Sequence, residues 1–277
     1  MTKSVKEKFD LSGRVTIITG GAGLLGEMHA EAIAEAGGCP VLADIKGALA
    51  TAKAKKIAKK YGVASLGIGV DITSRAEVER LAAAVLKKFR RIDSLINNAA
   101  NDPKVEATLD ESWTRFENFP LKEWNQDIAV GLTGAFLCSQ IIGAEMARRS
   151  GGVILNICSD LAVVAPDQRL YLKEGLPEEK QPVKPVSYSV VKTALIGLTR
   201  YLATYWADKN IRVNCISPGG VYNGQPEEFL RRIAFRIPMG RMAQVDEYKG
   251  AILFLLSDAS SYMTGANLII DGGRTCW

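Results

Sequence analysis

Short apolar runs rich in β-branched residues alternate along the chain with longer stretches whose apolar residues recur every three or four positions. The runs predict buried strands, and the stretches predict amphipathic helices. The predicted strands are residues 14–19, 39–44, 64–70, 94–97, 153–158, 212–217 and 267–270. The predicted helices are residues 24–36, 46–61, 74–89, 121–148, 187–206 and 246–256. This order predicts the α/β class, as one domain over residues 1–277 with a doubly wound parallel sheet of about seven strands and helices on both faces.

Two long connections interrupt the alternation, residues 100–120 and residues 161–186, and the second is called the insert below. Long loops on a rigid α/β scaffold usually carry function. The insert is rich in Pro, Glu and Lys, and its cations are Arg169, Lys173, Lys180 and Lys184. Cations at this position could bind a phosphate or a carboxylate, whereas the competing interpretation is a solvated or subunit-contacting loop.

A glycine-rich turn joins the first predicted strand to the first predicted helix. Glycines permit a tight turn and a close approach of the backbone to a pyrophosphate, and the helix N-terminus offers free N–H groups to it. This placement between strand and helix is the context that a dinucleotide site requires. The candidate cofactor-binding residues here are Gly20, Gly23, Leu24, Leu25 and Gly26.

Asp44 ends the second predicted strand. A carboxylate at this point can accept hydrogen bonds from both adenosine ribose hydroxyls and would repel a 2′-phosphate. The sequence therefore favours NAD over NADP, although Lys46 lies close enough along the chain to weaken the preference.

Tyr188 and Lys192 stand four residues apart in YSVVK and share one face of a predicted helix. An ammonium about 4–5 Å from a phenol contributes roughly 4 kcal/mol at an effective dielectric constant of about 20, which makes a tyrosinate accessible near neutral pH. Ser159 follows the fifth predicted strand and could hydrogen-bond a substrate oxygen. The chain has one histidine, His29, so acid–base chemistry at neutral pH must come mainly from other groups. Ser159, Tyr188 and Lys192 would supply it.

Composition narrows the function classes. The chain has 277 residues, of which 47% are hydrophobic and 23% charged, and a net charge of +5. The lysines of residues 46–61 fall largely off the apolar stripe, which is typical of a solvated face rather than a nucleic-acid interface. Five scattered cysteines predict neither a metal site nor disulfides. With no apolar segment at the N-terminus and no long apolar run, we expect a cytoplasmic protein without a membrane partner.

Together these motifs resemble the short-chain dehydrogenase/reductase family over essentially the whole chain, which implies a Rossmann fold. The resemblance implies that Tyr188 is the general acid/base, that Lys192 assists it and holds the nicotinamide ribose, and that Ser159 positions the reacting oxygen. It also implies NAD-dependent hydride transfer between nicotinamide and a secondary alcohol or ketone, and a homo-oligomer, either a dimer or a homotetramer. The resemblance extends to three further motifs, DI, NNAA and SPGG. It implies that the cofactor-binding residues in and directly after these motifs are Asp71, Ile72, Asn98, Ala99, Pro218, Gly219 and Val221.

The sequence departs from the family pattern at three places. Glycines are spaced G-x-x-G-x-x-G, with Leu24 where many members have glycine, and the insert separates Ser159 from Tyr188 by 29 residues. Gly131 stands where members typically carry an asparagine that supports a proton-relay water. This last departure leaves open a catalytically weak dinucleotide-binding scaffold or regulator as the alternative function.

The insert and the segment 219–240, a predicted substrate lid, resemble a branch found with bacterial surface-sugar and flagellin-glycan biosynthesis. That resemblance implies a nucleotide-linked or phosphorylated sugar as substrate and a place in carbohydrate biosynthesis. The predicted substrate-binding residues are Arg169, Tyr171 and Gln225.

Overall fold

The protein is represented by a computed structural model that describes residues 2–101, 112–149 and 151–277. Seven parallel strands form one sheet in the order β3-β2-β1-β4-β5-β6-β7. The strands are β1 Val15–Thr19, β2 Cys39–Asp44, β3 Leu66–Gly69, β4 Ser94–Asn97, β5 Gly152–Ile157, β6 Ile211–Pro218 and β7 Asn267–Ile270. The predicted doubly wound α/β sheet is thus confirmed. Its order reverses direction between β1 and β4, the point where such sheets bind ligands.

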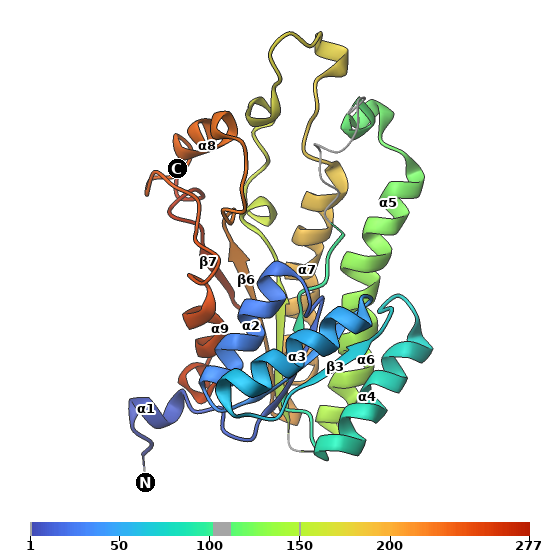
Figure 1. Cartoon of the computed structure of the whole chain (residues 1–277), viewed down its shortest axis with the longest axis vertical. Helices are drawn as coiled ribbons and strands as arrows, with labels where there is room; N and C mark the ends of the chain where they lie inside the picture. The colour runs from blue at the N-terminus through green and yellow to red at the C-terminus, as the bar shows by residue number, and fades with distance from the viewer. Residues whose placement is uncertain (1, 102–111, 150) are drawn as a thin grey trace.

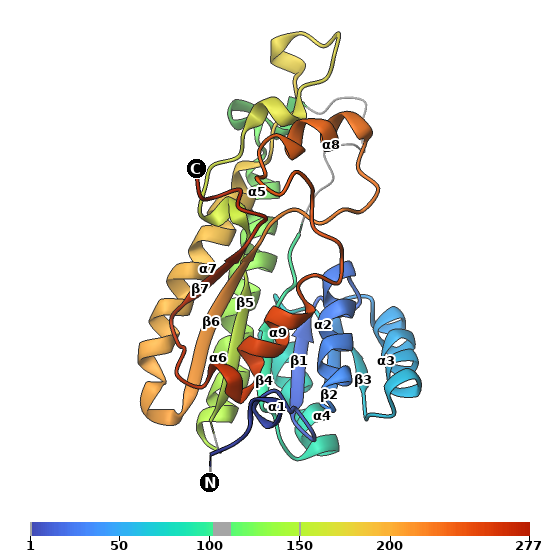
Figure 2. The ribbon, with the colours of Figure 1, turned by 90° about the vertical axis from the view of Figure 1, so that its left-hand side faces the viewer.

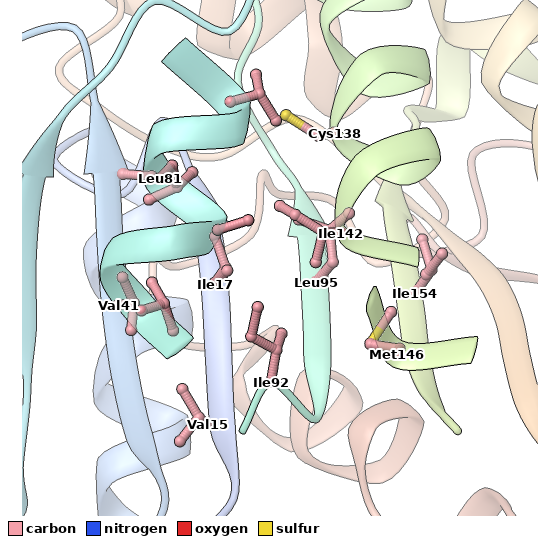
Figure 3. Packing of buried hydrophobic residues seen from close by; sticks show 14 of the residues in the cluster. Val15, Ile17, Val41, Leu81, Ile92, Leu95, Cys138, Ile142, Met146 and Ile154 are labelled. Carbon is pink, nitrogen blue, oxygen red and sulfur yellow. The ribbon is translucent and has the colours of Figure 1, made fainter. Parts of the chain in front are cut away.

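Helices cover both faces of the sheet (Figures 1 and 2). Their bounds are α1 Val5–Lys8, α2 Leu24–Glu35, α3 Gly47–Tyr61, α4 Arg75–Phe89, α5 Leu121–Ile128, α6 Gly134–Ala147, α7 Val186–Tyr205, α8 Glu227–Ala234 and α9 Lys249–Leu256. One core cluster joins the sheet to α4, α6 and α7, and Figure 3 shows part of it, with Leu81, Ile142 and Met146 against strand residues. A second cluster joins the opposite face to α2, α3 and α9. Burial on both faces explains why the strands read as continuous apolar runs.

The predicted helix over residues 121–148 is continuous but changes its winding. Between α5 and α6, residues Ala129–Thr133 form a π-helical segment. Such segments are rare and occur frequently at functional sites. The helix from Leu121 to Ala147 is long and apolar enough to cross a membrane by length and composition. Cys138, Ile142 and Met146 lie in the core cluster, so this helix packs as a core helix of the α/β fold.

The insert, α8 and the beginning of α5 gather at the end of the molecule to which the strands point (Figures 1 and 2). The insert contains two short 3₁₀ turns, Gln168–Tyr171 and Glu178–Lys180. In the earlier connection, over residues 100–120, residues 102–111 lie outside the described part of the chain. Because this is the carboxyl edge of a parallel sheet, it is where side chains for ligand binding converge.

Candidate active site

The glycine-rich turn forms a cradle that side chains would fill. Gly20 has φ of +61°, in the left-handed region that glycine adopts without cost. A Cβ at Gly26 would lie 2.2 Å from the Gly20 carbonyl oxygen, and a Cβ at Gly20 would lie 2.9 Å from the Ala99 Cα. The absence of side chains therefore lets α2 pack directly on the turn. Gly23 is the N-cap of α2 and makes no side-chain cap, so Leu24 and Leu25 begin the helix with their backbone N–H groups facing its open end.

Hydrogen bonds connect the loop after β4 to this cradle. Thr19 Oγ1 accepts from the backbone N–H groups of Asn98 and Ala99 at 3.0 and 3.1 Å. In return, Asn98 Nδ2 donates to the carbonyl oxygens of Thr19 and Gly20 at 3.0 and 3.2 Å. The two predicted motifs thus form one rigid unit at the switch point of the sheet, and the asparagine amide serves to hold the turn.

Asp44 lies beside the same turn at the end of β2. Its carboxylate accepts hydrogen bonds from the Ala22 N–H at 3.0 Å and the Lys46 N–H at 2.9 Å. Each carboxylate oxygen can accept more than one hydrogen bond, so the group retains capacity for ribose hydroxyls. Lys53 donates to the Ala22 carbonyl and forms an ion pair with Glu27 at 2.7 Å. The cradle, the exposed helix end and the carboxylate fit the diphosphate and adenosine of a nicotinamide dinucleotide.

The remaining predicted cofactor residues lie along the same edge and have structural partners of their own. The Asp71 carboxylate accepts from the backbone and the hydroxyl of Thr73, and the buried Ile72 side chain packs against Gly134. Pro218 ends β6, and Gly219 approaches the Asp271 backbone too closely for a Cβ. Val221 forms an isolated bridge with Ala243.

The three predicted catalytic residues come from β5 and α7. Lys192 is buried, and its ammonium donates to the Ile157 carbonyl oxygen at 2.8 Å and lies 5.8 Å from the centroid of the Tyr188 ring. Ile157 ends β5 two residues before Ser159, whose side chain is also buried. The lysine thereby connects the strand end that carries the serine to the helix turn that carries the tyrosine.

A buried ion pair fixes the hydroxyl of Ser159. This hydroxyl donates to Asp160 Oδ1 at 2.8 Å, and Arg274 Nη1 forms an ion pair with Asp160 Oδ2 at 2.6 Å. The Asp160 and Arg274 side chains are 4% and 11% exposed. Breaking such a pair leaves one charge buried without compensation, which is strongly unfavourable. The segment after β7 is therefore part of the candidate site. Sequence reasoning missed both residues, and the sole available signal was a carboxylate adjacent to the candidate serine.

A second buried carboxylate contacts the residue before Tyr188. Asp127, on α5, accepts hydrogen bonds from Asn101 Nδ2 at 2.8 Å and from the hydroxyl of Ser187, the residue before the tyrosine. The contact connects the loop after β4, α5 and α7. Nothing in the sequence around Asp127 predicted that this carboxylate belongs to the site, because its hydrogen-bond partners come from distant segments.

The insert packs against α8 and against residues 112–118. Leu170 is buried in a small cluster with Ile233, Ile237 and Met242. Arg236 forms an ion pair with Asp167 at 2.6 Å. On the other side, the Val183 N–H donates to Thr114 Oγ1 at 3.0 Å. These contacts bring three segments that are far apart in the sequence together above the strand ends.

The predicted substrate residues have partners within this layer. Arg169 forms an ion pair with Asp167 at 2.8 Å and remains largely exposed, and the Tyr171 ring lies 5.8 Å from that of Phe229. The Gln225 amide donates to the Val221 carbonyl and accepts from the Asn223 N–H, so it closes a turn before α8. Their contact with substrate remains a prediction.

Comparisons with known proteins agree with this geometry. Residues 14–171 match the short chain dehydrogenase family model. The chain belongs to the short-chain dehydrogenase family. Residues 178–275 match a related model described as enoyl-(acyl carrier protein) reductase.

The relatives of this short-chain dehydrogenase include dehydrogenases of small polyols. It is 34% identical to an NAD-dependent glycerol dehydrogenase of Listeria innocua, over 99% of this chain and 98% of the relative. It is 33% identical to a D-threitol dehydrogenase of Mycolicibacterium smegmatis, over 98% and 96%. A gluconate 5-dehydrogenase of Burkholderia cenocepacia, solved with NADP and tartrate, superposes with a TM-score of 0.85 at 28% identity, covering 99% of this chain and all of the other. The protein is thus an oxidoreductase that uses a nicotinamide cofactor and acts on small molecules.

This short-chain dehydrogenase differs from the family pattern around Gly131, and the structure gives the physical reason. A Cβ at Gly131 would lie 2.5 Å from Cγ1 of Val191, the residue before Lys192. The valine side chain thus fills the space into which a side chain at position 131 would extend. The packing leaves no room for the usual asparagine side chain, and the position falls within the π-helical segment.

Proposed function

We propose that the protein is an NAD-dependent oxidoreductase that interconverts a secondary alcohol and a ketone on a polyhydroxylated, sugar-like substrate. The observation that carries the proposal is the position of the Lys192 ammonium, which is anchored at the β5 terminus beside Ser159 and lies 5.8 Å from the Tyr188 ring. In the direction of oxidation, Tyr188 accepts the hydroxyl proton, Lys192 stabilises the tyrosinate, and Ser159 orients the substrate oxygen. The nicotinamide, when bound, accepts the hydride.

We propose NAD as the preferred cofactor because the Asp44 carboxylate would repel a 2′-phosphate. An NAD-dependent relative supports this choice, whereas the gluconate 5-dehydrogenase structure contains NADP. Replacing Asp44→Ser removes the charge, so the ratio of kcat/KM for NAD over NADP should fall at least tenfold. Replacing the exposed Asp208→Ser, which pairs with its neighbour Lys209, should leave the ratio unchanged. An unchanged ratio of kcat/KM for NAD over NADP in Asp44→Ser would refute the role of this carboxylate.

The substrate class is proposed from the relatives and the insert. Glycerol and D-threitol dehydrogenases support a polyol. The cation-bearing insert above the strand ends supports a phosphorylated or nucleotide-linked sugar as a more specific candidate, with the 219–240 segment acting as the substrate lid. Under this proposal the protein acts in the cytoplasm, in carbohydrate biosynthesis.

We also propose a homo-oligomer assembled through α6 and α7. Phe136 and Tyr201 are 46% and 63% exposed, and Tyr205 stacks on Tyr201 at the surface. Leu195, by contrast, is buried against the molecule's own core. Sedimentation equilibrium should give a dimer or tetramer, and Tyr201→Glu should shift the population to monomer.

The alternative function is a dinucleotide-bound scaffold without turnover, which the Gly131–Val191 packing favours because it replaces the usual asparagine. The two proposals are separated by following NADH formation with a panel of polyols, sugar phosphates and nucleotide sugars. Tyr188→Phe should reduce kcat at least 1000-fold and leave the NAD dissociation constant, measured by calorimetry, within twofold. Equal turnover in wild type and Tyr188→Phe would refute the mechanism, and NAD binding without turnover on any substrate would favour the scaffold.

A further inference from the structure

A second lysine lies against the tyrosine of the candidate active site. The Lys184 ammonium is 4.0 Å from the centroid of the Tyr188 ring, closer than the 5.8 Å of Lys192. A cation within about 6 Å of an aromatic ring face is attracted by the ring quadrupole. Lys184 belongs to the insert, so this extra segment of chain delivers a charge directly to the group proposed to move the proton.

The backbone at Lys184 is held in place on both sides. The Lys184 N–H donates to Gln168 Oε1 at 2.9 Å, and the preceding Val183 N–H donates to the buried Thr114 Oγ1 at 3.0 Å. Buried prolines at 182 and 185 flank the pair and restrict its backbone dihedrals. Pro185, the residue after Lys184, is also the N-cap of α7, so Lys184 lies directly before the helix that carries Tyr188. These contacts fix the backbone from which the Lys184 side chain reaches the ring.

We propose that Lys184 is a positioning residue that acts with Lys192 to stabilise the deprotonated form of Tyr188. The proposal rests on the function proposed above. During oxidation the alcohol loses its hydroxyl proton to the Tyr188 oxygen and its carbon-bound hydride to the nicotinamide, leaving the ketone. In this step a nearby cation favours the proton-accepting form of the phenol, because an opposite charge within about 4–6 Å stabilises the ionised state.

Two buried carboxylates belong to the surrounding elements, and each has partners of its own. Asp127 contacts the adjacent Ser187, and both of its carboxylate oxygens already accept hydrogen bonds. Asp160 is neutralised by Arg274. The ammonium groups of Lys184 and Lys192 both lie within 6 Å of the centroid of the Tyr188 ring.

The competing role for Lys184 is a contact with an anionic substrate. In that case its removal would raise KM for a phosphate-bearing substrate and leave the pH profile unchanged. The proposed role makes the reverse prediction, since a tyrosine that ionises less readily changes kcat/KM for charged and uncharged substrates alike.

The experiment titrates Tyr188 directly in the NAD-bound enzyme. Tyrosinate absorbance near 295 nm is recorded against pH in each background, with and without the Tyr188→Phe change, so that the difference isolates one of the eight tyrosines. In Lys184→Met the midpoint of the Tyr188 titration should rise by about half to one pH unit relative to wild type. Lys184→Arg should retain most of the wild-type midpoint. The matched control is Lys180→Met, which removes the same charge from an exposed position of the same insert.

The kinetic counterpart is the pH profile of kcat/KM with an active uncharged polyol and an active phosphorylated substrate. For Lys184→Met, the rising limb of the profile should shift to higher pH with both substrates, so that kcat/KM at pH 7 falls roughly three- to tenfold. Gln168→Ala, which frees the Lys184 backbone, should give a smaller shift in the same direction. Unchanged midpoints in folded Lys184→Met, or a KM increase confined to the phosphorylated substrate, would overturn the proposal. The absorbance titration needs no turnover, so it still decides the role of Lys184 if the proposed reaction fails.

Discussion

The proposed cofactor region and the proposed substrate region of this molecule, called the cofactor region and the substrate region below, are built by different means. The cofactor region, from β1 to the loop after β4, is held by glycine packing and by hydrogen bonds that join the side chains of Thr19 and Asn98 to the backbone of the two loops. The substrate region consists of the insert, the 219–240 segment and residues 112–118, joined by side chains such as Leu170 and Asp167. A site for an invariant ligand is rigid in its backbone, whereas a site for a variable ligand depends on exchangeable side chains.

This contrast predicts where substitutions act. Changes in the cofactor region should alter dinucleotide binding and global stability together, because the turn is part of the sheet's switch point. Changes in the insert should alter substrate affinity or the proton-transfer step with little effect on global unfolding. The buried ion pair between Asp160 and Arg274 belongs to neither region and fixes Ser159 after β5, so its loss should affect both stability and turnover.

The largest effect is expected for Arg274→Leu, which leaves the Asp160 carboxylate buried without its partner. Unfolding free energy measured in urea should fall by about 4 kcal/mol, and kcat should fall because Ser159 loses its fixed orientation. Arg75→Leu, which breaks an exposed pair with Glu79, is the control and should cost under about 1 kcal/mol. Comparable losses for both variants would contradict the structural role of the buried pair.

Gly26→Ala should act on the cofactor region. The added Cβ would lie 2.2 Å from the Gly20 carbonyl oxygen, so the turn must shift away from the helix end. We expect a loss of about 3 kcal/mol of stability and an NAD dissociation constant raised at least tenfold. Gly197→Ala in α7, where nothing lies within 4 Å of the new atom, should instead be neutral or stabilising. Wild-type NAD affinity in Gly26→Ala would argue against the cradle.

A third prediction concerns the one histidine, which lies buried in α2. Burial lowers the pKa of His29 to about 4, and neither ring nitrogen has a hydrogen-bond partner within bonding geometry. In the unfolded chain this pKa is about 6.5, so the unfolded state binds more protons below that pH. Stability is therefore complete above about pH 6.5 and falls as the pH approaches 4. From pH 7 to pH 5 the loss should be about 2 kcal/mol.

The measurement is urea unfolding at pH 7, 6 and 5 for wild type and His29→Leu. Subtracting the variant's pH dependence removes the contributions of other titrating groups. Parallel curves for the two proteins would show that His29 does not titrate on unfolding.

The smallest effect on global stability is expected for Leu170→Ala. This residue anchors the insert to Ile233 and Ile237, so its truncation should weaken the docking of the insert by about 2 kcal/mol and leave global unfolding nearly unchanged. Substrate KM should rise severalfold, and amide hydrogen exchange should accelerate within the insert. Leu172→Ala, at a more exposed position, should do neither. A global destabilisation equal to that of Gly26→Ala would erase the distinction between the two regions.

Most of the cofactor region could be predicted from the sequence because its signals are local. The glycine turn, Asp44 and the NNAA motif each stand at the end of a predicted strand, so a short stretch of sequence is enough to recognise each of them. The predicted strand over 94–97 coincides with β4, and the second strand coincides with β2. The α9 helix begins at Lys249, later than the predicted residue 246, because Gln244–Tyr248 forms turns before it.

The substrate region could be predicted much less. The insert was recognisable as a cation-bearing loop, yet the cations are not equivalent. Arg169 pairs with Asp167, whereas Lys184 lies against Tyr188. Helix α8 was not predicted within the 219–240 segment, since the apolar face that stabilises it packs on the distant insert.

The sequence by itself determined the alternation of strands and helices, the dinucleotide turn and the tyrosine–lysine spacing, because each depends on neighbours within one or two helical turns. The tertiary structure decided which charges meet. Arg274 reaches Asp160 across 114 residues, and Thr114 fixes the backbone beside Lys184 across 69. Contacts over such separations depend on how the chain packs around the sheet, which residue spacing alone does not encode.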